Sequence, residues 1–258
     1  MGKKWYLTGG VIIIGSLLWE DHLNNILPIN NYIRNNWRKY HIENISKIMV
    51  KLPIRYGRCS DRNIFTMVFS NNCQRYKRTR LGTGYIYQFK TNPITNFKQI
   101  ICEARAMSIA EGMNGNFWGG NRDIWGNMGI LFNTSKIEKI IKNEILCKWA
   151  KEFFDNNGNS KMGNFKFSNE RPCLTNKGEL TIKWVEPVDE KDSNQVSNFD
   201  FLIATATVPN HKVNNYDKYP EYDVIANSVK SDTDRYYFIN NVLSGISTFQ
   251  DNKILNEL

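Results

Sequence analysis

The sequence predicts an α+β fold built on a mainly antiparallel sheet or barrel. Short stretches of β-branched and aromatic residues, which are typical of strands, dominate the first half of the 258-residue chain. Helical patterns are inserted between these stretches and appended after them, without the regular alternation of a βαβ fold. Because 41% of the residues are hydrophobic, the chain can bury one large core, and we expect a single domain over residues 1–258.

The first half of the chain is expected to be mostly strand. The pattern of residues 5–14 predicts a strand that breaks at Gly15 into a turn. A helix is expected over 20–38, because Ile33 and Trp37 lie one turn apart on one face. The other expected elements of this half are strands over 48–54, 64–70 and 82–89, a basic loop over 71–80, and a helix over 95–110.

The second half is expected to carry more helix. Residues 135–155 have the periodicity of an amphipathic helix, whose expected buried side holds Ile137, Ile140, Ile141, Ile145, Leu146 and Trp149. A loop rich in Gly, Asn and Trp over 114–126 precedes a strand at 128–132. The remaining expected elements are strands over 163–167, 180–185 and 199–208, a polar surface loop over 187–198, and closing helices over 221–230 and 234–249.

Composition and charge narrow the function classes. The formal net charge of +9 favours acidic ligands or surfaces, although heavy use of Lys, Asn and Ile also fits a base-composition bias of the genome. The five cysteines form no CxxC pair and the three histidines form no HExxH motif, so we expect a cytoplasmic protein with free thiols and no metal site. No stretch reaches the ~20 uninterrupted apolar residues that span a bilayer, so we expect no membrane partner.

Two short motifs predict a pocket. The apolar run over residues 11–14 ends in Gly15 and Ser16, which turn a buried strand into a loop. Much later in the chain, Glu111 and Gly112 place a carboxylate beside a residue that lets the backbone turn sharply. Together the motifs predict a floor of backbone N–H groups with one acid–base residue.

The order of the motifs resembles the γ-glutamylcyclotransferase-like superfamily. The family signature YGSL corresponds to Ile14-Gly15-Ser16-Leu17, its G-V-V-Y strand to Gly84-Tyr85-Ile86-Tyr87, and its LD-x-x-EG turn to Met107-Ser108-Ile109-Ala110-Glu111-Gly112. The resemblance covers roughly residues 8–133. Residues 1–133 are therefore expected to form a cyclotransferase-like core, and residues 134–258 a divergent elaboration packed on it.

The resemblance implies a fold and a reaction. The implied fold is a mixed, mainly antiparallel barrel or sheet with surrounding helices and a C-terminal α/β elaboration. The implied reaction releases 5-oxoproline from a γ-glutamyl amide or peptide, by attack of the substrate's own α-amine on its γ-carbonyl. Glu111 would act as general base and acid, and backbone N–H groups at Gly15, Ser16 and Leu17 would bind the glutamyl carboxylate or the oxyanion. Neither a metal nor an organic cofactor is needed.

Two departures from the family pattern bear on this expectation. Ile14 replaces the signature Tyr and removes a hydroxyl beside the pocket, and Met107-Ser108 replaces Leu-Asp.

Arginines on both sides of Tyr56-Gly57 would bind a substrate carboxylate or phosphate, or else form a solvated basic edge. The expected substrate-binding residues are Ile14, Gly15, Ser16, Leu17, Arg55, Arg58 and Gly112.

Each motif also has a purely structural explanation. Gly15 and Ser16 can simply end a strand, and Glu111 can be a solvated residue at a helix end. Glu103 and Glu170 are the acids that would serve if the alignment slips. The pairing of the two motifs in the family order is what favours the catalytic interpretation.

Several residues near the motifs have weaker functional interpretations. Trp118 and Trp125 would form a pocket lid or, more simply, anchor the 114–126 loop to the core. Cys59 and Cys102 suggest a thiol nucleophile, but no histidine is close in sequence, and buried structural thiols explain them better.

Two other function classes remain open from sequence. One is a binding module of the same fold, altered at Ile14, which sequesters a small anionic ligand. The other is a protein that contacts nucleic acid through the basic run over 75–80, which a solvated hairpin tip explains as well and which no RNA- or DNA-binding motif accompanies. Residues 134–258 would cover the pocket, form a homodimer interface or contact another partner.

Overall fold

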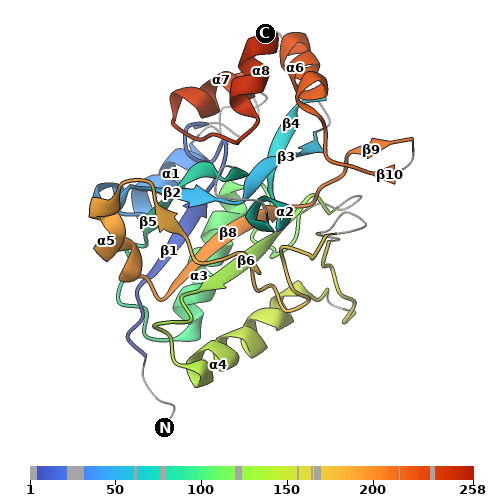
Figure 1. Cartoon of the computed structure of the whole chain (residues 1–258). Coiled ribbons are helices and arrows are strands. Elements are labelled where there is room, and N and C mark those ends of the chain that lie inside the picture. Colours follow the sequence, from blue (N-terminus) through green and yellow to red (C-terminus); the bar gives the residue numbers. More distant parts are fainter. Residues whose placement is uncertain are drawn as a thin grey trace.

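A mixed six-stranded sheet runs through the computed structural model of the chain (Figure 1). From one edge to the other it contains β6 (Gly126–Phe132), β8 (Phe201–Thr207), β1 (Gly9–Ile13), β5 (Gly82–Gln88), β2 (Ile48–Leu52) and β7 (Glu186–Pro187). The β1–β8 pair is parallel and the other pairs are antiparallel. The structure describes residues 5–21, 32–60, 63–75, 80–119, 124–155, 157–163, 165, 170–214, 216–232 and 236–258.

The sheet confirms the predicted α+β class, but it is open. β6 and β7 form its two edges, and within the described residues they do not pair to close the predicted barrel. In the middle, β1 is buried at all five positions. Its glycines permit this tight packing: a Cβ at Gly10 would lie 2.4 Å from the Tyr87 carbonyl oxygen, and one at Gly9 would lie 2.4 Å from the Phe201 ring.

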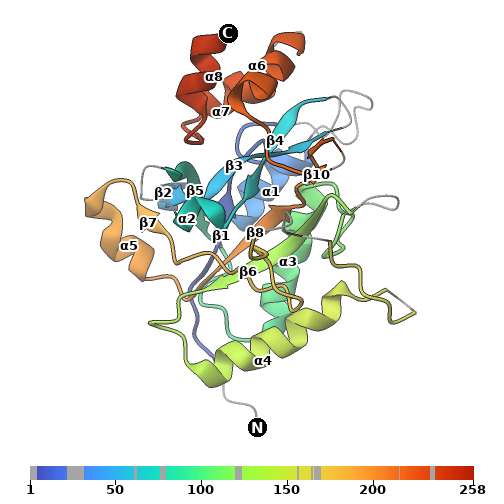
Figure 2. The same cartoon turned by 45° about the vertical axis from the view of Figure 1, so that its right-hand side comes forward.

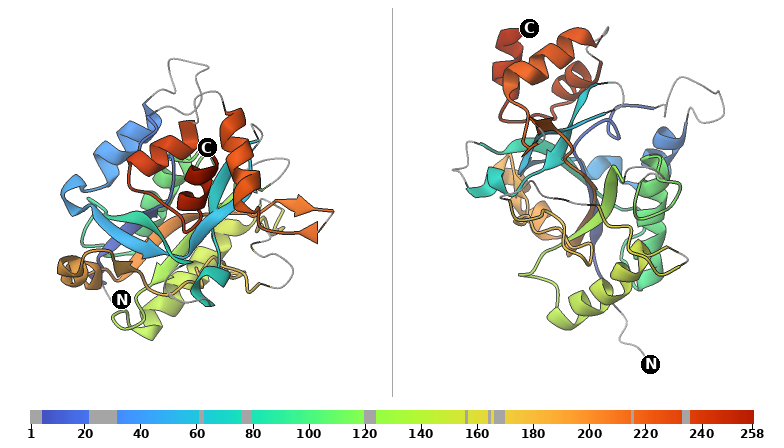
Figure 3. Two further views of the ribbon diagram at one scale, coloured as in Figure 1. Left: turned by 45° about the horizontal axis from the view of Figure 1, so that its top comes forward. Right: turned by 90° about the vertical axis from the view of Figure 1, so that its right-hand side faces the viewer.

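Three helices pack beside the sheet, two of them on one side of it and the third across its lower end (Figure 3). They are α1 (Ile33–His41), α3 (Phe97–Ala110) and α4 (Lys139–Trp149), and α3 contacts both of the others. Asn96 caps α3 by accepting a hydrogen bond from the Gln99 N–H at 3.2 Å. Apolar residues on one side of α3, among them Ile100, Ala104 and Met107, are buried in the core.

A separate hairpin and three short helices lie at one end of the molecule (Figure 2). The hairpin pairs β3 (Ile54–Cys59) with β4 (Phe65–Phe69), and the helices are α6 (Tyr222–Ser231), α7 (Tyr236–Leu243) and α8 (Asp251–Glu257). The Tyr56 N–H donates to the Gln250 side-chain oxygen at 3.1 Å, and the Tyr56 ring lies 6.4 Å from that of Phe238. The hairpin is thereby attached to the C-terminal helices.

Several differences from the sequence prediction have local causes. The expected strand over 48–54 is divided by Pro53, which has no N–H to donate, so that Ile54 starts β3 instead. The expected helix over 234–249 ends with α7, because Gly245 has a φ of +80° and reverses the chain before the unpredicted α8. In the expected helix over 135–155, α4 is shorter and Ile140 is 77% exposed rather than buried.

The expected strand over 180–185 does not form. Leu180 and Ile182 are buried, and Leu180 donates to the Ile130 carbonyl at 2.8 Å, but only single bridges connect this segment to its neighbours. The alternating apolar side chains of this segment are therefore buried, but its backbone does not form the continuous row of hydrogen bonds that defines a strand. Gly163 and Phe165 of the expected 163–167 strand are likewise not in a strand, and the rest of that segment lies outside the described residues.

The remaining unpredicted elements are short. The segment expected as a basic loop begins with α2 (Asn72–Arg75), and the expected 187–198 loop contains a 3₁₀ turn (Glu190–Asp192) followed by α5 (Ser193–Ser197). A two-residue hairpin pairs β9 (Lys212–Val213) with β10 (Tyr216–Asp217). Within the described residues, no helix has the length and apolarity needed to cross a membrane.

Candidate functional site

A cavity of about 410 Å³ lies at the edge of the sheet where β1 and β8 end. Because these two strands are parallel, their carboxyl ends meet there, which is a common location for ligand sites in sheets of this kind. The cavity brings together several residues that the sequence singles out, namely Ile14, Gly15, Ser16, Leu17, Arg58 and Glu111. Hydroxyl-bearing residues from other parts of the chain also line it, namely Ser60, Thr66, Thr205, Thr207 and Tyr237.

The chain leaves β1 in a tight turn that begins at Gly15. Leu18 donates its N–H to the Gly15 carbonyl at 3.0 Å, and Glu20 donates to the Ser16 carbonyl at 2.8 Å. A turn of this kind uses its later N–H groups internally and leaves its first ones directed outward. Gly15 leaves room for its neighbour, because a Cβ there would lie in a tight contact, 3.0 Å from the Tyr237 hydroxyl oxygen.

Glu111 is placed by the way in which α3 ends. Gly112 has a φ of +84°, which reverses the chain, while the Met113 N–H donates to the Ser108 carbonyl at 2.8 Å and the Gly112 N–H to the Ile109 carbonyl at 3.0 Å. This is the hydrogen-bond pattern of a Schellman cap. Gly112 does not line the cavity; it sets the direction of the neighbouring Glu111.

The Glu111 side chain is 16% exposed and is surrounded by groups that act on its charge. Burial raises the pKa of Glu111, because removal from water disfavours the carboxylate. The cation of Arg34 and a hydrogen bond with Thr205 lower this pKa, Glu20 raises it, and the net shift is upward. A carboxyl group with a raised pKa is suited to accept and return a proton near neutral pH.

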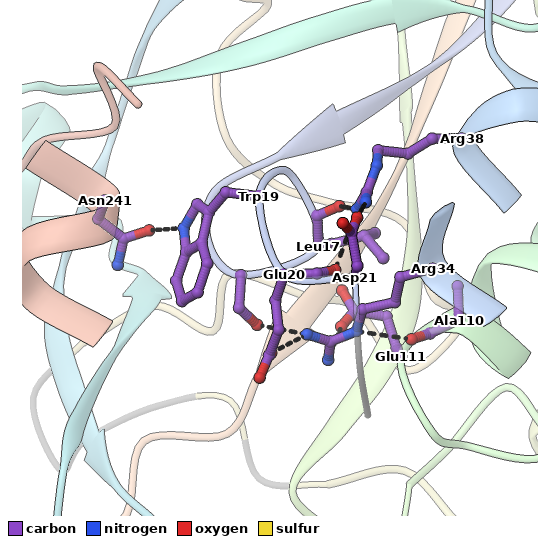
Figure 4. Close-up of polar contacts among 10 residues, drawn as sticks. Leu17, Trp19, Glu20, Asp21, Arg34, Arg38, Ala110, Glu111 and Asn241 are labelled. Atoms are coloured by element: carbon purple, nitrogen blue, oxygen red, sulfur yellow. Dashed lines mark hydrogen bonds and ion pairs between the residues drawn. The ribbon is translucent and has the colours of Figure 1, made fainter. Parts of the chain in front are cut away.

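Sequence reasoning missed Arg34, which lies between the two motifs (Figure 4). From α1, its guanidinium donates to the Ala110 carbonyl at 3.0 Å and to the Ser16 hydroxyl at 2.9 Å, and it pairs with Glu20. One pattern in the sequence could have found it: Arg34 is three residues before Trp37 and therefore lies on the same side of the helix as this large apolar residue.

A second arginine of α1 holds the same turn. Arg38 follows Arg34 by one helical turn and donates to the Leu17 carbonyl at 2.7 Å and to the Glu20 carbonyl at 3.2 Å (Figure 4). It also pairs with Asp21. The turn after β1 is therefore bound to α1 through two guanidinium groups.

The two predicted arginines of β3 go to different places. Arg58 lines the cavity, with its guanidinium carbon 5.9 Å from the centre of the Trp125 ring, which lines the same cavity. Arg55 lies outside the cavity lining, over the Tyr219 ring at 4.0 Å, and burial lowers its pKa. A bulge at Gly57, which an inspection of residue spacing does not reveal, shifts the register between the two.

The alternative acids lie outside the cavity lining. Glu103 is 2.8 Å from the His41 ring nitrogen Nδ1. Glu170 accepts hydrogen bonds from the Ser70 hydroxyl at 2.7 Å and from the Tyr219 hydroxyl at 2.5 Å. Both carboxylates are buried in structural networks, so Glu111 is the better-placed acid.

The other sequence candidates have separate surroundings. Trp118 lies in a different hollow from Trp125. None of the five cysteines forms a disulfide, and burial raises the pKa of Cys73 to about 11 and that of Cys173 to about 12. Cys59 is half-buried and Cys102 is exposed, so the prediction of a buried thiol is wrong for Cys102. Most of the basic run over 75–80 lies outside the described residues. In the described part of the chain, no group of three or more His, Cys, Asp or Glu side chains is arranged to hold a metal ion.

The second half of the chain contributes directly to this site. β8 lies between β1 and β6 in the main sheet and supplies Thr205, while α7 supplies Tyr237. A boundary at residue 133 therefore does not coincide with a boundary in the sheet. Comparisons with protein-family models, curated proteins and solved structures gave no significant match to this chain.

Proposed function

We propose that this chain is a γ-glutamylcyclotransferase-like enzyme, which releases 5-oxoproline from a γ-glutamyl amide or peptide with Glu111 as the acid–base residue. One observation carries the proposal: the Gly15–Leu17 turn and Glu111, which are remote in sequence, line the same cavity. The cavity volume of about 410 Å³ also falls in the range of small-molecule sites.

The proposed reaction needs one proton carrier. Glu111 takes a proton from the α-ammonium group of the substrate, and the freed amine attacks the γ-carbonyl carbon to form the C–N bond of a five-membered ring. The resulting oxyanion collapses and the original amide C–N bond breaks as Glu111 returns this proton to the leaving nitrogen. The ring nitrogen, which carries a second extra proton after the attack, then gives it to the Glu111 carboxylate, which passes it to the leaving amine or to solvent. Since both reacting groups belong to one molecule, holding it curled supplies much of the acceleration.

The rest of the cavity fits the polar groups of such a substrate. The first N–H groups of the Gly15–Leu17 turn would bind the glutamyl carboxylate or the oxyanion. Arg58 brings a cation to the cavity that suits a substrate carboxylate. We also propose a cytoplasmic location, which is favoured by five cysteines that form no disulfide.

The test is 5-oxoproline release, measured by mass spectrometry over a panel of γ-glutamyl amino acids, peptides and amines. We expect Glu111→Gln to retain the fold and to lose about 10²- to 10⁴-fold in turnover, the usual contribution of a general acid–base group. Glu144→Gln, which makes the same chemical change on exposed α4, serves as the matched control. Full turnover by Glu111→Gln would refute the assignment of the acid.

Ile14 favours a second candidate, a binding module without turnover. Ile14 places an aliphatic side chain in the cavity lining, at the position where the family that the sequence resembles has the hydroxyl of its signature Tyr. In that case a γ-glutamyl compound would protect the protein against thermal unfolding without release of 5-oxoproline, and Glu111→Gln would leave the protection in place.

A further inference from the structure

The guanidinium of Arg34 is the polar centre between the two motifs. Its side chain is 7% exposed, and a charge buried to that extent is unfavourable unless it is well paired. Its Nε donates to the Ala110 carbonyl and its Nη1 to the Ser16 hydroxyl, while Glu20 supplies the counter-charge. One rigid planar group therefore contacts the turn after β1 and the last residue of α3 together (Figure 4).

We propose that Arg34 is a positioning residue, which holds the Glu111 turn at a set distance from the Gly15–Leu17 turn and is itself held by Glu20. The proposal rests on the function proposed above and names the group that aligns its acid with its substrate floor. The Ala110 carbonyl belongs to the peptide bond that joins Ala110 to Glu111. The hydrogen bond from Arg34 to this carbonyl therefore limits the directions in which the Glu111 side chain can point.

The geometry leaves Glu111 available for substrate. Arg34 makes its close ion pair with Glu20 through Nη1, whereas its Nη2 is 3.9 Å from the Glu111 carboxylate oxygen. At that separation the cation stabilises the charge of Glu111 without a close hydrogen bond. The carboxylate oxygens can therefore receive a proton from the substrate ammonium group.

Glu111 faces charged or titratable groups on four sides. Arg34 comes from α1, Glu20 from the turn after β1, Tyr237 from α7, and Arg58 from β3 lines the same cavity. Burial raises the pKa of Tyr237 to about 12, and the charge of Glu111 adds to that rise. Near neutral pH Tyr237 thus stays uncharged, and Arg34 and Glu20 are the groups that act on the Glu111 pKa in opposite directions.

The opposite effects of Arg34 and Glu20 on the pKa of Glu111 distinguish a positioning role of Arg34 from a role in holding the turn alone. Loss of the Arg34 cation should raise the pKa of Glu111, and loss of the Glu20 charge should lower it. Arg38 is the matched control. It donates hydrogen bonds to the Leu17 and Glu20 carbonyls of the same turn, but it is not among the groups that shift the pKa of Glu111.

The experiment measures the pKa of the Glu111 carboxyl by ¹³C NMR of protein labelled at its glutamates, and Glu111→Gln serves to assign the resonance. The proteins compared are wild type, Arg34→Gln, Arg34→Lys, Glu20→Gln and Arg38→Gln. We expect a pKa rise of about one unit in Arg34→Gln, a fall in Glu20→Gln, and no change in Arg38→Gln. Arg34→Lys should keep the wild-type pKa. Equal values in Arg34→Gln and Arg38→Gln would overturn the proposal.

A second readout uses the rate of 5-oxoproline release against pH. Arg34→Gln should lower kcat by about 100-fold, the typical cost of a misplaced acid, and should move the acidic limb of the profile to higher pH. Arg34→Lys should retain the position of the limb but not the full kcat, since an ammonium cannot make both hydrogen bonds. A wild type without turnover would refute the proposed function, whereas the titration tests the coupling of Arg34 and Glu20 to Glu111 without substrate. If Arg34→Gln does not fold, Arg34→Lys and Glu20→Gln carry the test.

Discussion

At the scale of single residues, Glu111 is held in a state that favours chemistry over stability. Its burial opposes ionisation, and the cation that acts on its charge, Arg34, is engaged by Glu20. Glu170, in contrast, lies outside the cavity lining and accepts hydrogen bonds from the Ser70 and Tyr219 hydroxyls, whereas Glu111 lines the cavity and its hydrogen-bond partner there is Thr205. The difference between these two buried acids supports Glu111 as the functional one.

This state predicts that Glu111→Gln stabilises the protein above neutral pH. The folded-state pKa of Glu111 is raised above its ordinary value of 4.5, so the folded protein binds this proton more tightly than the unfolded chain. The stability contributed by protonation is present below pH 4.5 and is lost as the pH rises through the raised value. Urea unfolding at pH 8 should therefore show a higher midpoint for Glu111→Gln than for wild type, with the difference shrinking towards pH 4.

Glu144→Gln, on the exposed face of α4, should show no such pH-dependent difference. A Glu111→Gln variant less stable than wild type at pH 8 would contradict this account. It would mean that the attraction between Arg34 and Glu111 outweighs the cost of burial.

At the scale of elements, the ends of β1 and α3 determine the site. β1 ends in a turn in which Gly15 packs closely against Tyr237, and α3 ends in a Schellman cap that needs the positive φ of Gly112. The sequence indicates both glycines as pocket residues, yet Gly112 acts through the backbone direction that it gives to Glu111. The motif Glu-Gly thus combines a chemical group with the turn that aims it.

We expect Gly112→Ala to lower the free energy of unfolding by about 1–2 kcal/mol, the cost of a side chain in the left-handed region, and to reduce kcat by moving Glu111. Gly158→Ala is the control, because Gly158 has a φ of +78°, lies outside the cavity lining, and would place a Cβ with nothing within 4 Å. It should lose similar stability without loss of kcat. Gly112→Asn should recover part of both losses, because asparagine tolerates the left-handed region better than alanine. Equal kcat in wild type, Gly112→Ala, Gly112→Asn and Gly158→Ala would contradict the role of the cap.

At the scale of the whole molecule, the C-terminal helices complete the cavity and bind the hairpin that forms its other wall. α7 places Tyr237 against Gly15, and the start of α8 is joined to β3 through Gln250. Next to Gln250, Asp251 is 5% exposed, and burial raises its pKa to about 6. The attachment of this end of the molecule should therefore depend on pH.

Asp251→Asn should stabilise the protein at pH 8, where wild-type Asp251 is charged. A shift from 3.8 to about 6 corresponds to at most about 3 kcal/mol, and this stability is lost between those two values as the pH rises. Thermal unfolding followed by circular dichroism should show the difference at pH 8 and almost none at pH 4. Exposed Asp223→Asn controls for the loss of one negative charge, and an Asp251→Asn variant no more stable than this control at pH 8 would refute the prediction.

Local pattern was sufficient for many elements. The alternating runs around β4 and β5, the apolar periodicity of α3 and α6, and the buried run of β8 were predicted to within about two residues at each end. These segments carry their own spacing, and α3 also carries its own capping residue, Asn96. The sequence also pointed to Gly15, Ser16, Arg58 and Glu111, which the structure then places around one cavity.

By itself, therefore, the sequence determined the α+β class, many of the regular elements and the two motifs of the candidate site. Only the tertiary structure decided that β8 lies beside β1, that Arg55 points away from the cavity, and that Arg34 joins Ser16 to Ala110. The physical reason is that strand pairing and the burial of a charge depend on groups that are distant in sequence. Periodicity reports which face of an element is buried, but the partner that it meets is known only once the chain has folded.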